Sequence, residues 1–226
     1  MTFSLLVRDP ATGAFGGAAA TGSLCVGGWV LRGNLGAGLS ASQGAAPSTF
    51  WGEDVLTRMA AGAVAEAALA AVTAPDPGRD WRQLACLDPL GRTAAHSGPQ
   101  NGAARGHVCQ TNRVASGNML TSLDSLDGLL AAYEAATGPM SARLLAALIA
   151  TQQDGGDQRG LKSAALLVLH PDCPPLSLRV DWSPDPLAAL HDLHHRATTG
   201  DYAKWTHAVP VETDRHRADP QILDND

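Results

Sequence analysis

Residues 1–7, Met1-Thr2-Phe3-Ser4-Leu5-Leu6-Val7, place a hydroxyl residue directly after the initiator methionine and then begin an apolar run. Residues 3–7 are typical of a buried β-strand, and residues 15–20 are typical of a strand that returns beside it. Between them, residues 9–13 (DPATG) carry proline and glycine at turn-forming positions. The sequence therefore predicts an opening β-hairpin with Thr2 at its start.

Thr2 has the chemistry of a nucleophile if Met1 is removed, because one residue would then carry both a hydroxyl and a free α-amine. A threonine hydroxyl reacts only when a base takes its proton, and an N-terminal amine can be that base. The unperturbed pKa of such an amine is about 7.7–8.0, so part of it is neutral near physiological pH. An ordinary start residue is the alternative, and Thr2 taken alone favours it.

The rest of the chain alternates blocks of predicted strands with blocks of predicted helices. Strands are predicted over residues 35–42, 83–88, 93–97, 107–112, 164–170 and 176–180. Helices are predicted over residues 51–72 with a cap at Ser48 or Thr49, 123–136, 142–153 with a cap at Ser141, and 186–197. The glycine-rich residues 21–33 stay ambiguous. Hairpin-linked strands pair antiparallel, so we expect an α+β fold of two mostly antiparallel sheets with helices outside them.

The composition indicates one large globular domain, residues 1–197, followed by a polar C-terminal extension, residues 198–226. The formal net charge of −6 argues against a nucleic-acid or anionic-membrane partner, since both need basic patches. We see neither a signal peptide nor an apolar run of about 18 residues, so a cytoplasmic protein is expected. Four scattered cysteines indicate reduced thiols, each expected to be buried and inert: Cys25, Cys86, Cys109 and Cys173.

Two further segments carry groups that could serve a catalytic site. Residues 155–165 (GGDQRGLKSAA) lie between a helix end and a strand start, and they could orient a nucleophile and bind a carboxylate or carbonyl. A capped turn with an ion pair between Asp157 and Arg159 is the alternative, slightly favoured on spacing. Asn118 could donate its side-chain amide to a developing oxyanion. A local Asx turn explains Asn118 equally well.

Taken together, the motifs of this chain resemble a known family over roughly residues 2–195. They are Thr2-Phe3-Ser4, Arg8-Asp9-Pro10-x-Thr12-Gly13, Val26-Gly27, Ser42-Gln43, Arg82-Gln83, Gly117-Asn118-x-Leu120, Gly156-Asp157-x-Arg159-Gly160, Leu178-Arg179-Val180-Asp181 and Asp185-Pro186. This pattern resembles DUF1028, a domain of unknown function placed in the N-terminal nucleophile (Ntn) hydrolase superfamily. The glycine-rich segment around Asp157 is the most specific part of the resemblance.

The resemblance implies a four-layer αββα sandwich with an amidohydrolase-type site. Thr2 would be the nucleophile and its own amine the base, acting directly or through one water. The candidate catalytic residues are Thr2, Asn118 and Asp157, and the candidate substrate-binding residues are Asp9, Gln43, Arg159 and Ser163. Gly22 stands where related proteins often carry a lysine or another polar residue, so no catalytic lysine is assigned.

The expected function is hydrolysis of a C–N bond in a small amide or peptide. A non-catalytic protein that binds a small anionic metabolite, or an oligomeric scaffold, would use the same fold. No cofactor is expected. His191 and His195 are four positions apart on the last predicted helix, but the glutamate of an H-E-x-x-H zinc motif is missing, so no metal is expected either. We expect a homodimer.

Overall fold

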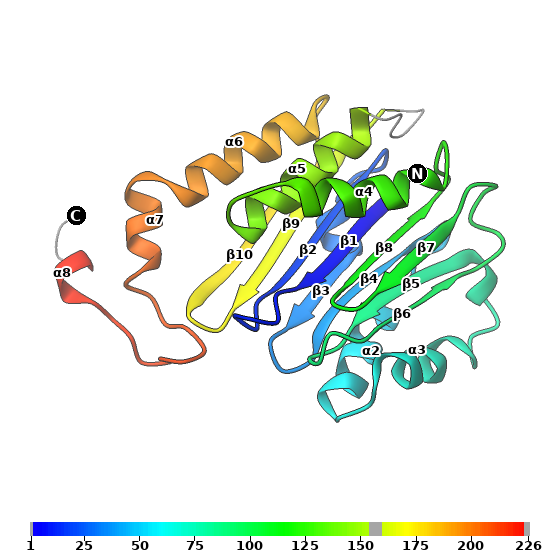
Figure 1. Cartoon of the computed structure of the whole chain (residues 1–226), viewed down its shortest axis with the longest axis horizontal. Helices are drawn as coiled ribbons and strands as arrows, with labels where there is room; N and C mark the ends of the chain where they lie inside the picture. The colour runs from blue at the N-terminus through cyan, green and yellow to red at the C-terminus, as the bar shows by residue number, and fades with distance from the viewer. Residues whose placement is uncertain (1, 154–159, 224–226) are drawn as a thin grey trace.

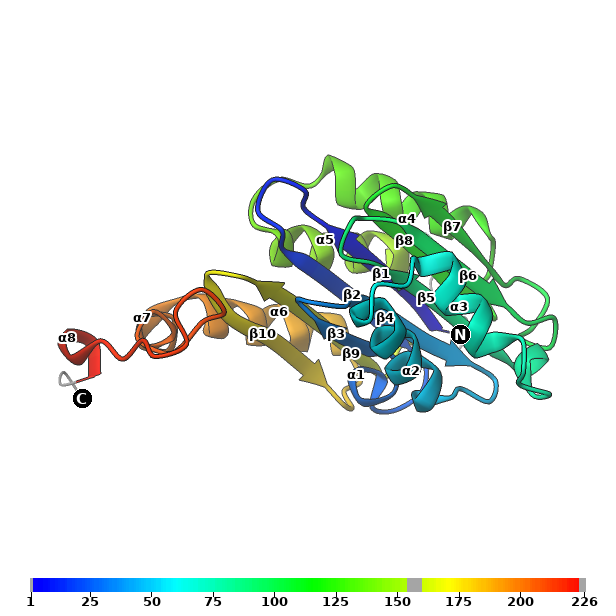
Figure 2. The ribbon, with the colours of Figure 1, turned by 90° about the horizontal axis from the view of Figure 1, so that it is seen from below.

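The computed structural model describes residues 2–153 and 160–223, and within them two antiparallel sheets pack face to face (Figures 1 and 2). The larger sheet has the strand order β10-β9-β2-β1-β8-β7. Its strands are β1 (Thr2–Arg8), β2 (Phe15–Thr21), β7 (Gly106–Gln110), β8 (Arg113–Asn118), β9 (Ser163–His170) and β10 (Cys173–Val180). The smaller sheet has the order β3-β4-β5-β6, made of β3 (Leu31–Asn34), β4 (Gly38–Gly44), β5 (Arg82–Leu87) and β6 (Thr93–Ser97).

Helices cover the outer face of each sheet and complete the four layers (Figure 1). The larger sheet is covered by α4 (Asp124–Ala135), α5 (Met140–Gln153) and α6 (Pro186–Thr198), and the smaller sheet by α2 (Thr49–Ala60) and α3 (Ala65–Thr73). The short helix α1 (Val26–Trp29) and a 3-10 turn (Arg79–Trp81) lie in connections. The expected αββα sandwich of mostly antiparallel sheets is therefore confirmed.

The central strand β1 is buried on both faces, which explains its nearly continuous apolar sequence. Phe3 and Leu5 belong to the core between the larger sheet and its helices, where they pack with residues such as Leu148 of α5. Leu6 points the other way, into the core between the two sheets, with Leu39 of β4. Alternation along a strand thus puts Thr2, like Leu6, on the face toward the smaller sheet.

The layer between the two sheets changes from apolar to polar along its length. Away from Thr2 it is filled by apolar side chains, namely Leu6, Phe15, Leu31, Leu39, Leu87, Val114 and Leu169. At the Thr2 end the equivalent positions are polar, namely Thr21, Asn118 and Ser163 on the larger sheet and Gln43 and Gln83 on the smaller one; all five are nearly fully buried. Hydrophobic burial therefore stabilises one end of the sandwich, and the other end holds hydrogen-bonding groups.

The sequence misjudged three connections. Residues 35–42 were predicted as one strand, but the chain turns there and forms the β3–β4 hairpin. The single helix predicted over residues 51–72 is two helices, because Gly62 has φ 94°, a left-handed value that ends α2. The strand predicted over residues 107–112 ends at Gln110, and a second strand, β8, follows it and pairs with β1.

Helix caps were predicted with mixed success. Ser48 caps α2, since its side-chain oxygen accepts the backbone N–H of Trp51. Ser141 is not a cap, because α5 begins at Met140 and the Ser141 hydroxyl contacts His194 instead. Asp185 caps α6 by accepting the backbone N–H of Ala188, and Pro186 occupies the first turn.

The C-terminal extension is partly helical, with α7 (Gly200–Thr206) and α8 (Pro220–Leu223). Both helices lie beyond β10 and project away from the sandwich (Figures 1 and 2). No residue of α7 is buried. Within the described residues, no helix combines the length and the apolar character needed to cross a membrane.

Candidate active site

Four polar side chains form a row across the larger sheet at the polar end of the sandwich. Thr2 pairs with Asn118 on β8 and with Thr21 on β2, and Thr21 in turn pairs with Ser163 on β9. Thr2 is partly buried, and its three neighbours are almost fully buried. The structure therefore brings together the predicted residues Thr2, Asn118 and Ser163, although they lie far apart in the sequence.

The Thr2 hydroxyl contacts a second hydroxyl. Its Oγ1 atom lies 2.9 Å from Oγ1 of Thr21, and either atom can be the donor. Thr21 Oγ1 also accepts the backbone N–H of Ser23 at 3.3 Å. Thr21 was not among the predicted site residues. In the sequence, Thr21 is only a hydroxyl residue at the end of a strand of small residues. Its place opposite Thr2 becomes visible when β1 and β2 are paired in register.

A buried glutamine of the smaller sheet faces this row. The amide nitrogen of Gln83 shares its two N–H groups among three oxygens: the backbone carbonyls of Gly106 and Gly117, both at 2.9 Å, and the Ser97 hydroxyl at 2.7 Å. Because a carbonyl can only accept, these contacts fix which end of the Gln83 amide is nitrogen. Its oxygen Oε1 must then face the other way, toward Gln43 and Asn118.

Gln83 Oε1 accepts hydrogen bonds from two other amides. Gln43 Nε2 donates to it at 2.7 Å, and Asn118 Nδ2 donates at 3.2 Å. Gln43 Nε2 also lies 3.4 Å from the backbone carbonyl oxygen of Thr2. One buried acceptor thus orients both side-chain amides that flank Thr2.

Within the described part of the chain, the Asn118 amide nitrogen has one hydrogen-bond acceptor. A side-chain amide nitrogen carries two N–H groups, and the contact with Gln83 uses one of them. Asn118 is 2% exposed and is the last residue of β8, directly across from Thr2. A side-chain amide donor held in a buried setting can stabilise an oxyanion.

Ser163 is committed to holding the chain that follows β2. Its hydroxyl donates to the backbone carbonyl of Ser23 at 2.8 Å and accepts the backbone N–H of Val26 at 3.1 Å. Ser163 has no exposed surface. These contacts make it a support for the chain that follows Thr21, and its predicted contact with a substrate stays a prediction.

Asp9 lies at the opposite end of β1 from Thr2, so the structure does not bring it to the row. Its carboxylate accepts the Ala11 backbone N–H at 2.9 Å and the Thr12 hydroxyl at 2.8 Å. These hydrogen bonds, that of Ala11 first, lower the pKa of Asp9. The contacts of Asp9 are those of a turn residue between β1 and β2, so its predicted role in substrate binding gains no support from its position.

Asp157 and Arg159 lie outside the described residues. The end of their segment is described, and there the backbone N–H of Lys162 donates to the Thr21 carbonyl at 2.8 Å. The glycine-rich segment therefore leads into the row of polar side chains, although the Lys162 side chain itself is exposed.

The hydrogen-bond network reaches a histidine on β7. Ser97 Oγ, which also contacts Gln83, lies 3.0 Å from Nδ1 of His107. Loss of water around the ring, and then the nearby His96, lower the pKa of His107, although the residue is exposed overall. Among the described residues, no three His, Cys, Asp or Glu side chains come together in a way that could hold a metal ion.

The cysteines differ in environment. Cys86 is buried, which raises the pKa of its thiol to about 12 and keeps it protonated. Cys25 is partly buried, whereas Cys109 and Cys173 are exposed, so the expectation that each cysteine is buried is wrong for these two.

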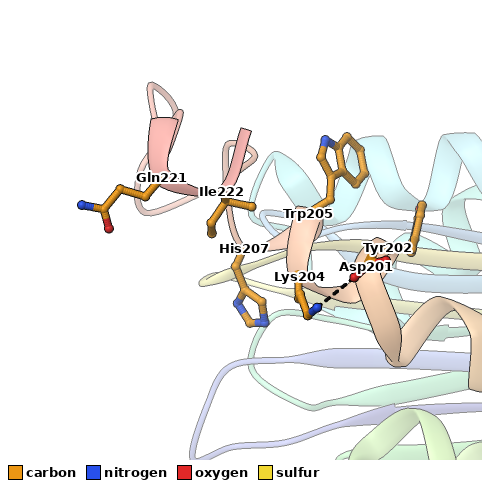
Figure 3. Close-up of a pocket in the computed structure, with 7 residues that line it drawn as sticks. All are labelled: Asp201, Tyr202, Lys204, Trp205, His207, Gln221 and Ile222. Atoms are coloured by element: carbon orange, nitrogen blue, oxygen red, sulfur yellow. Dashed lines mark hydrogen bonds and ion pairs between the residues drawn. The ribbon is translucent and has the colours of Figure 1, made fainter. Parts of the chain in front are cut away.

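A separate concave surface lies on the C-terminal extension (Figure 3). It is lined by Asp201, Tyr202, Lys204, Trp205, His207, Gln221 and Ile222. An ion pair of 2.8 Å joins Lys204 to Asp201. None of the predicted site residues that the structure describes lines this surface, so it is distinct from the row at Thr2.

A family model described as "Family of unknown function (DUF1028)" matches residues 2–190. The chain belongs to the DUF1028 family. A crystal structure from the same family, of a protein from Silicibacter pomeroyi, is 55% identical, covers 96% of this chain and 95% of that chain, and has a TM-score of 0.92. The likeness therefore extends past the family match into the C-terminal extension.

Two other solved structures resemble this DUF1028 protein at low identity. Eukaryotic HslV from Trypanosoma brucei has a TM-score of 0.44 at 15% identity, over 74% of this chain and 99% of that chain. Anbu (ancestral beta-subunit) from Yersinia bercovieri has a TM-score of 0.38 at 12% identity, over 89% of this chain and 97% of that chain. No curated protein matches the sequence significantly.

Proposed function

We propose that this DUF1028 protein is an Ntn-type hydrolase that cleaves a C–N bond in a small amide or peptide after Met1 has been removed. The observation that carries the proposal is the position of Thr2. It begins the central strand, its hydroxyl contacts Thr21, and a buried amide donor, Asn118, lies on the neighbouring strand. Nucleophile, base and oxyanion donor would then share one end of the inter-sheet layer.

The proposed reaction begins when the Thr2 α-amine takes the hydroxyl proton, directly or through one water. Thr2 Oγ1 attacks the amide carbonyl carbon, and the second N–H of Asn118 stabilises the oxyanion. The C–N bond breaks as the leaving amine receives the proton, and an ester on Thr2 Oγ1 remains. Water, activated by the same α-amine, then cleaves the ester and frees the carboxylic acid.

The proposal is tested with a β-lactone, a strained cyclic ester that acylates an activated hydroxyl. Intact mass establishes whether Met1 is absent, and peptide mass spectrometry locates the acyl group. We expect one adduct at Thr2 in protein that lacks Met1, a slower adduct in Thr2→Ser, and none in Thr2→Ala.

Protein that keeps Met1 is the matched control, because it has the same hydroxyl without the free amine. Equal acylation with and without Met1 would remove the amine from the mechanism. Acylation of Thr2→Ala at the wild-type rate would remove Thr2 itself.

A further inference from the structure

Gln43 carries a buried acceptor that nothing in the described structure satisfies. Its side chain is 1% exposed, and its Oε1 atom is buried without a hydrogen-bond partner. Buried polar atoms almost always have a partner, so each exception needs an explanation. Thr2 lies beside this one, because the nitrogen of the same amide is 3.4 Å from the Thr2 carbonyl oxygen.

The identity of the unpartnered atom follows from the surrounding hydrogen bonds. Asn and Gln amides can be placed with nitrogen and oxygen exchanged, so their orientation must be argued from their neighbours. The carbonyls of Gly106 and Gly117 require nitrogen on their side of the Gln83 amide, which leaves Gln83 Oε1 facing Gln43. Exchanging the Gln43 atoms would then set two amide oxygens against each other at 2.7 Å. The atom without a donor is therefore Gln43 Oε1.

Removal of Met1 creates new donors close to this acceptor. While Met1 is attached, the Thr2 nitrogen is a peptide nitrogen with a single N–H. Once it is free, the same nitrogen carries two N–H groups as an amine or three as an ammonium. The new donors therefore belong to Thr2, the residue whose carbonyl oxygen already lies 3.4 Å from the Gln43 amide nitrogen. The oxygen of that same amide has no partner.

We propose that Gln43 Oε1 accepts a hydrogen bond from the free α-amine of Thr2, and that Gln83 is the positioning residue that orients both Gln43 and Asn118 around Thr2. The use of this contact in catalysis rests on the proposed function; the contact itself requires only the removal of Met1. Gln43 thereby changes from a candidate substrate-binding residue to one that positions the base.

The contact has a chemical purpose that suits this chain. An acceptor that holds one N–H restricts rotation of the amine, so the nitrogen lone pair can be directed at the Thr2 hydroxyl. The amide oxygen does this without adding a charge beside the base. Gly22 has no side chain that could hold the amine. The carboxylate of Asp9 lies in the β1–β2 turn, at the far end of β1 from Thr2.

The test measures the Thr2 amine directly, without a substrate. Protein that lacks Met1 is treated with an amine-acetylating reagent over a pH series, and peptide mass spectrometry gives the pKa of the Thr2 amine. In Gln43→Met, which keeps the side-chain length and removes the acceptor, we expect the pKa to fall by about one unit, a tenfold change. In Gln43→Glu, which keeps an acceptor and adds negative charge, we expect it to rise. Gln100→Met, at an exposed glutamine away from the row, should match the wild type.

Gln83→Met tests the positioning role. It should lower the pKa of the amine in the same direction as Gln43→Met, since Gln43 loses the contact that orients it. Thermal unfolding identifies variants that fail to fold. If Gln43→Met fails, Gln43→Asn replaces it, because it stays polar and retracts the acceptor by one methylene. The expected fall in the pKa of the Thr2 amine is the same.

An amine pKa that is the same in folded Gln43→Met, or its replacement, and in the wild type would overturn the inference. The outcome is separate from that of the proposed function. If Thr2→Ala were acylated like the wild type, the hydrolase proposal would fall, while a shifted amine pKa in Gln43→Met would still support the hydrogen bond.

Discussion

Thr2 and Thr21 face each other across the β1–β2 pair, with 2.9 Å between their hydroxyl oxygens. We expect Thr21→Val, which keeps the branched shape and removes the hydroxyl, to slow β-lactone acylation of Thr2 by about three- to tenfold. This is the loss that one hydrogen bond of about 0.5–1.5 kcal/mol would cause. Thr57→Val on α2, an exposed threonine whose hydroxyl donates to the Glu53 carbonyl one turn earlier, is the control. An unchanged rate in folded Thr21→Val would show that the hydroxyl pair does not prepare Thr2.

Ser163 supports the segment after β2 through two hydrogen bonds to backbone groups. Ser163→Ala leaves a buried N–H of Val26 and the Ser23 carbonyl without that partner, so we expect the free energy of unfolding to fall by about 1–3 kcal/mol. Urea unfolding measures the change. Ser177→Ala, at an exposed position of β10, should leave the stability nearly unchanged. Similar stability in the two variants would contradict the support assigned to Ser163.

The sequence predicted most of the fold because local patterns dictate it. The β1–β2 hairpin follows from an apolar run, a proline–glycine turn and a second run, and the structure confirms that the two strands pair antiparallel. The break between α2 and α3 was missed because Gly62 is tolerated in a helix by pattern alone, whereas its left-handed φ appears only in three dimensions. Strand β8 was missed because its small residues do not by themselves indicate a strand; only their pairing with β1 identifies it.

The candidate site was less accessible to prediction than the fold. Thr2 and Asn118 became candidates through the family resemblance, since their side-chain chemistry alone left a start residue and an Asx turn open; the structure places them on adjacent strands. Gln83 was not found, because a polar residue at the start of an apolar strand looks like an ordinary strand end. Its importance comes from contacts with groups such as Gly117 and Asn118, which are distant in the sequence.

A pH-dependent loss of stability is expected from His194 on α6. Its ring contacts Ser141 Oγ at 2.9 Å, and its pKa is lowered by burial first and then by His191 and His195. Because the folded pKa lies below the unfolded value of 6.5, the unfolded state binds the proton more readily. The stability from this group is therefore complete above pH 6.5 and is lost as the pH falls through 6.5 toward the folded pKa.

Urea unfolding between pH 7 and pH 5 should show a smaller loss in His194→Gln, which can still bond to Ser141, than in the wild type. Raising the salt concentration in the wild type screens the repulsion from His191 and His195 but leaves the effect of burial. It should therefore flatten the pH dependence only in part. An equal pH slope in wild type and His194→Gln would exclude this group as the cause.

Asp88 ties the β5–β6 turn to the start of α3. Its side chain is fully buried. Its carboxylate accepts the Nε–H of Arg92 at 2.6 Å and the backbone N–H of Ala65, the first residue of α3, at 3.1 Å. Burial alone would raise the pKa of Asp88, but the N–H donors of Arg92, Leu90 and Ala65 outweigh it and leave the pKa lowered.

Asp88→Asn should lower the free energy of unfolding by about 2–3 kcal/mol at pH 7, because an amide cannot replace a carboxylate that accepts from a charged partner. The lowered pKa also sets the pH window. The stability is complete above the unfolded value of 3.8 and is lost as the pH falls through the folded pKa. The difference between wild type and Asp88→Asn in urea unfolding should therefore narrow below pH 4. Asp201→Asn, which removes an exposed ion pair with Lys204, is the matched control and should leave the stability unchanged. A difference that stays constant from pH 7 to pH 3 would mean that the Asp88 charge does not stabilise the fold.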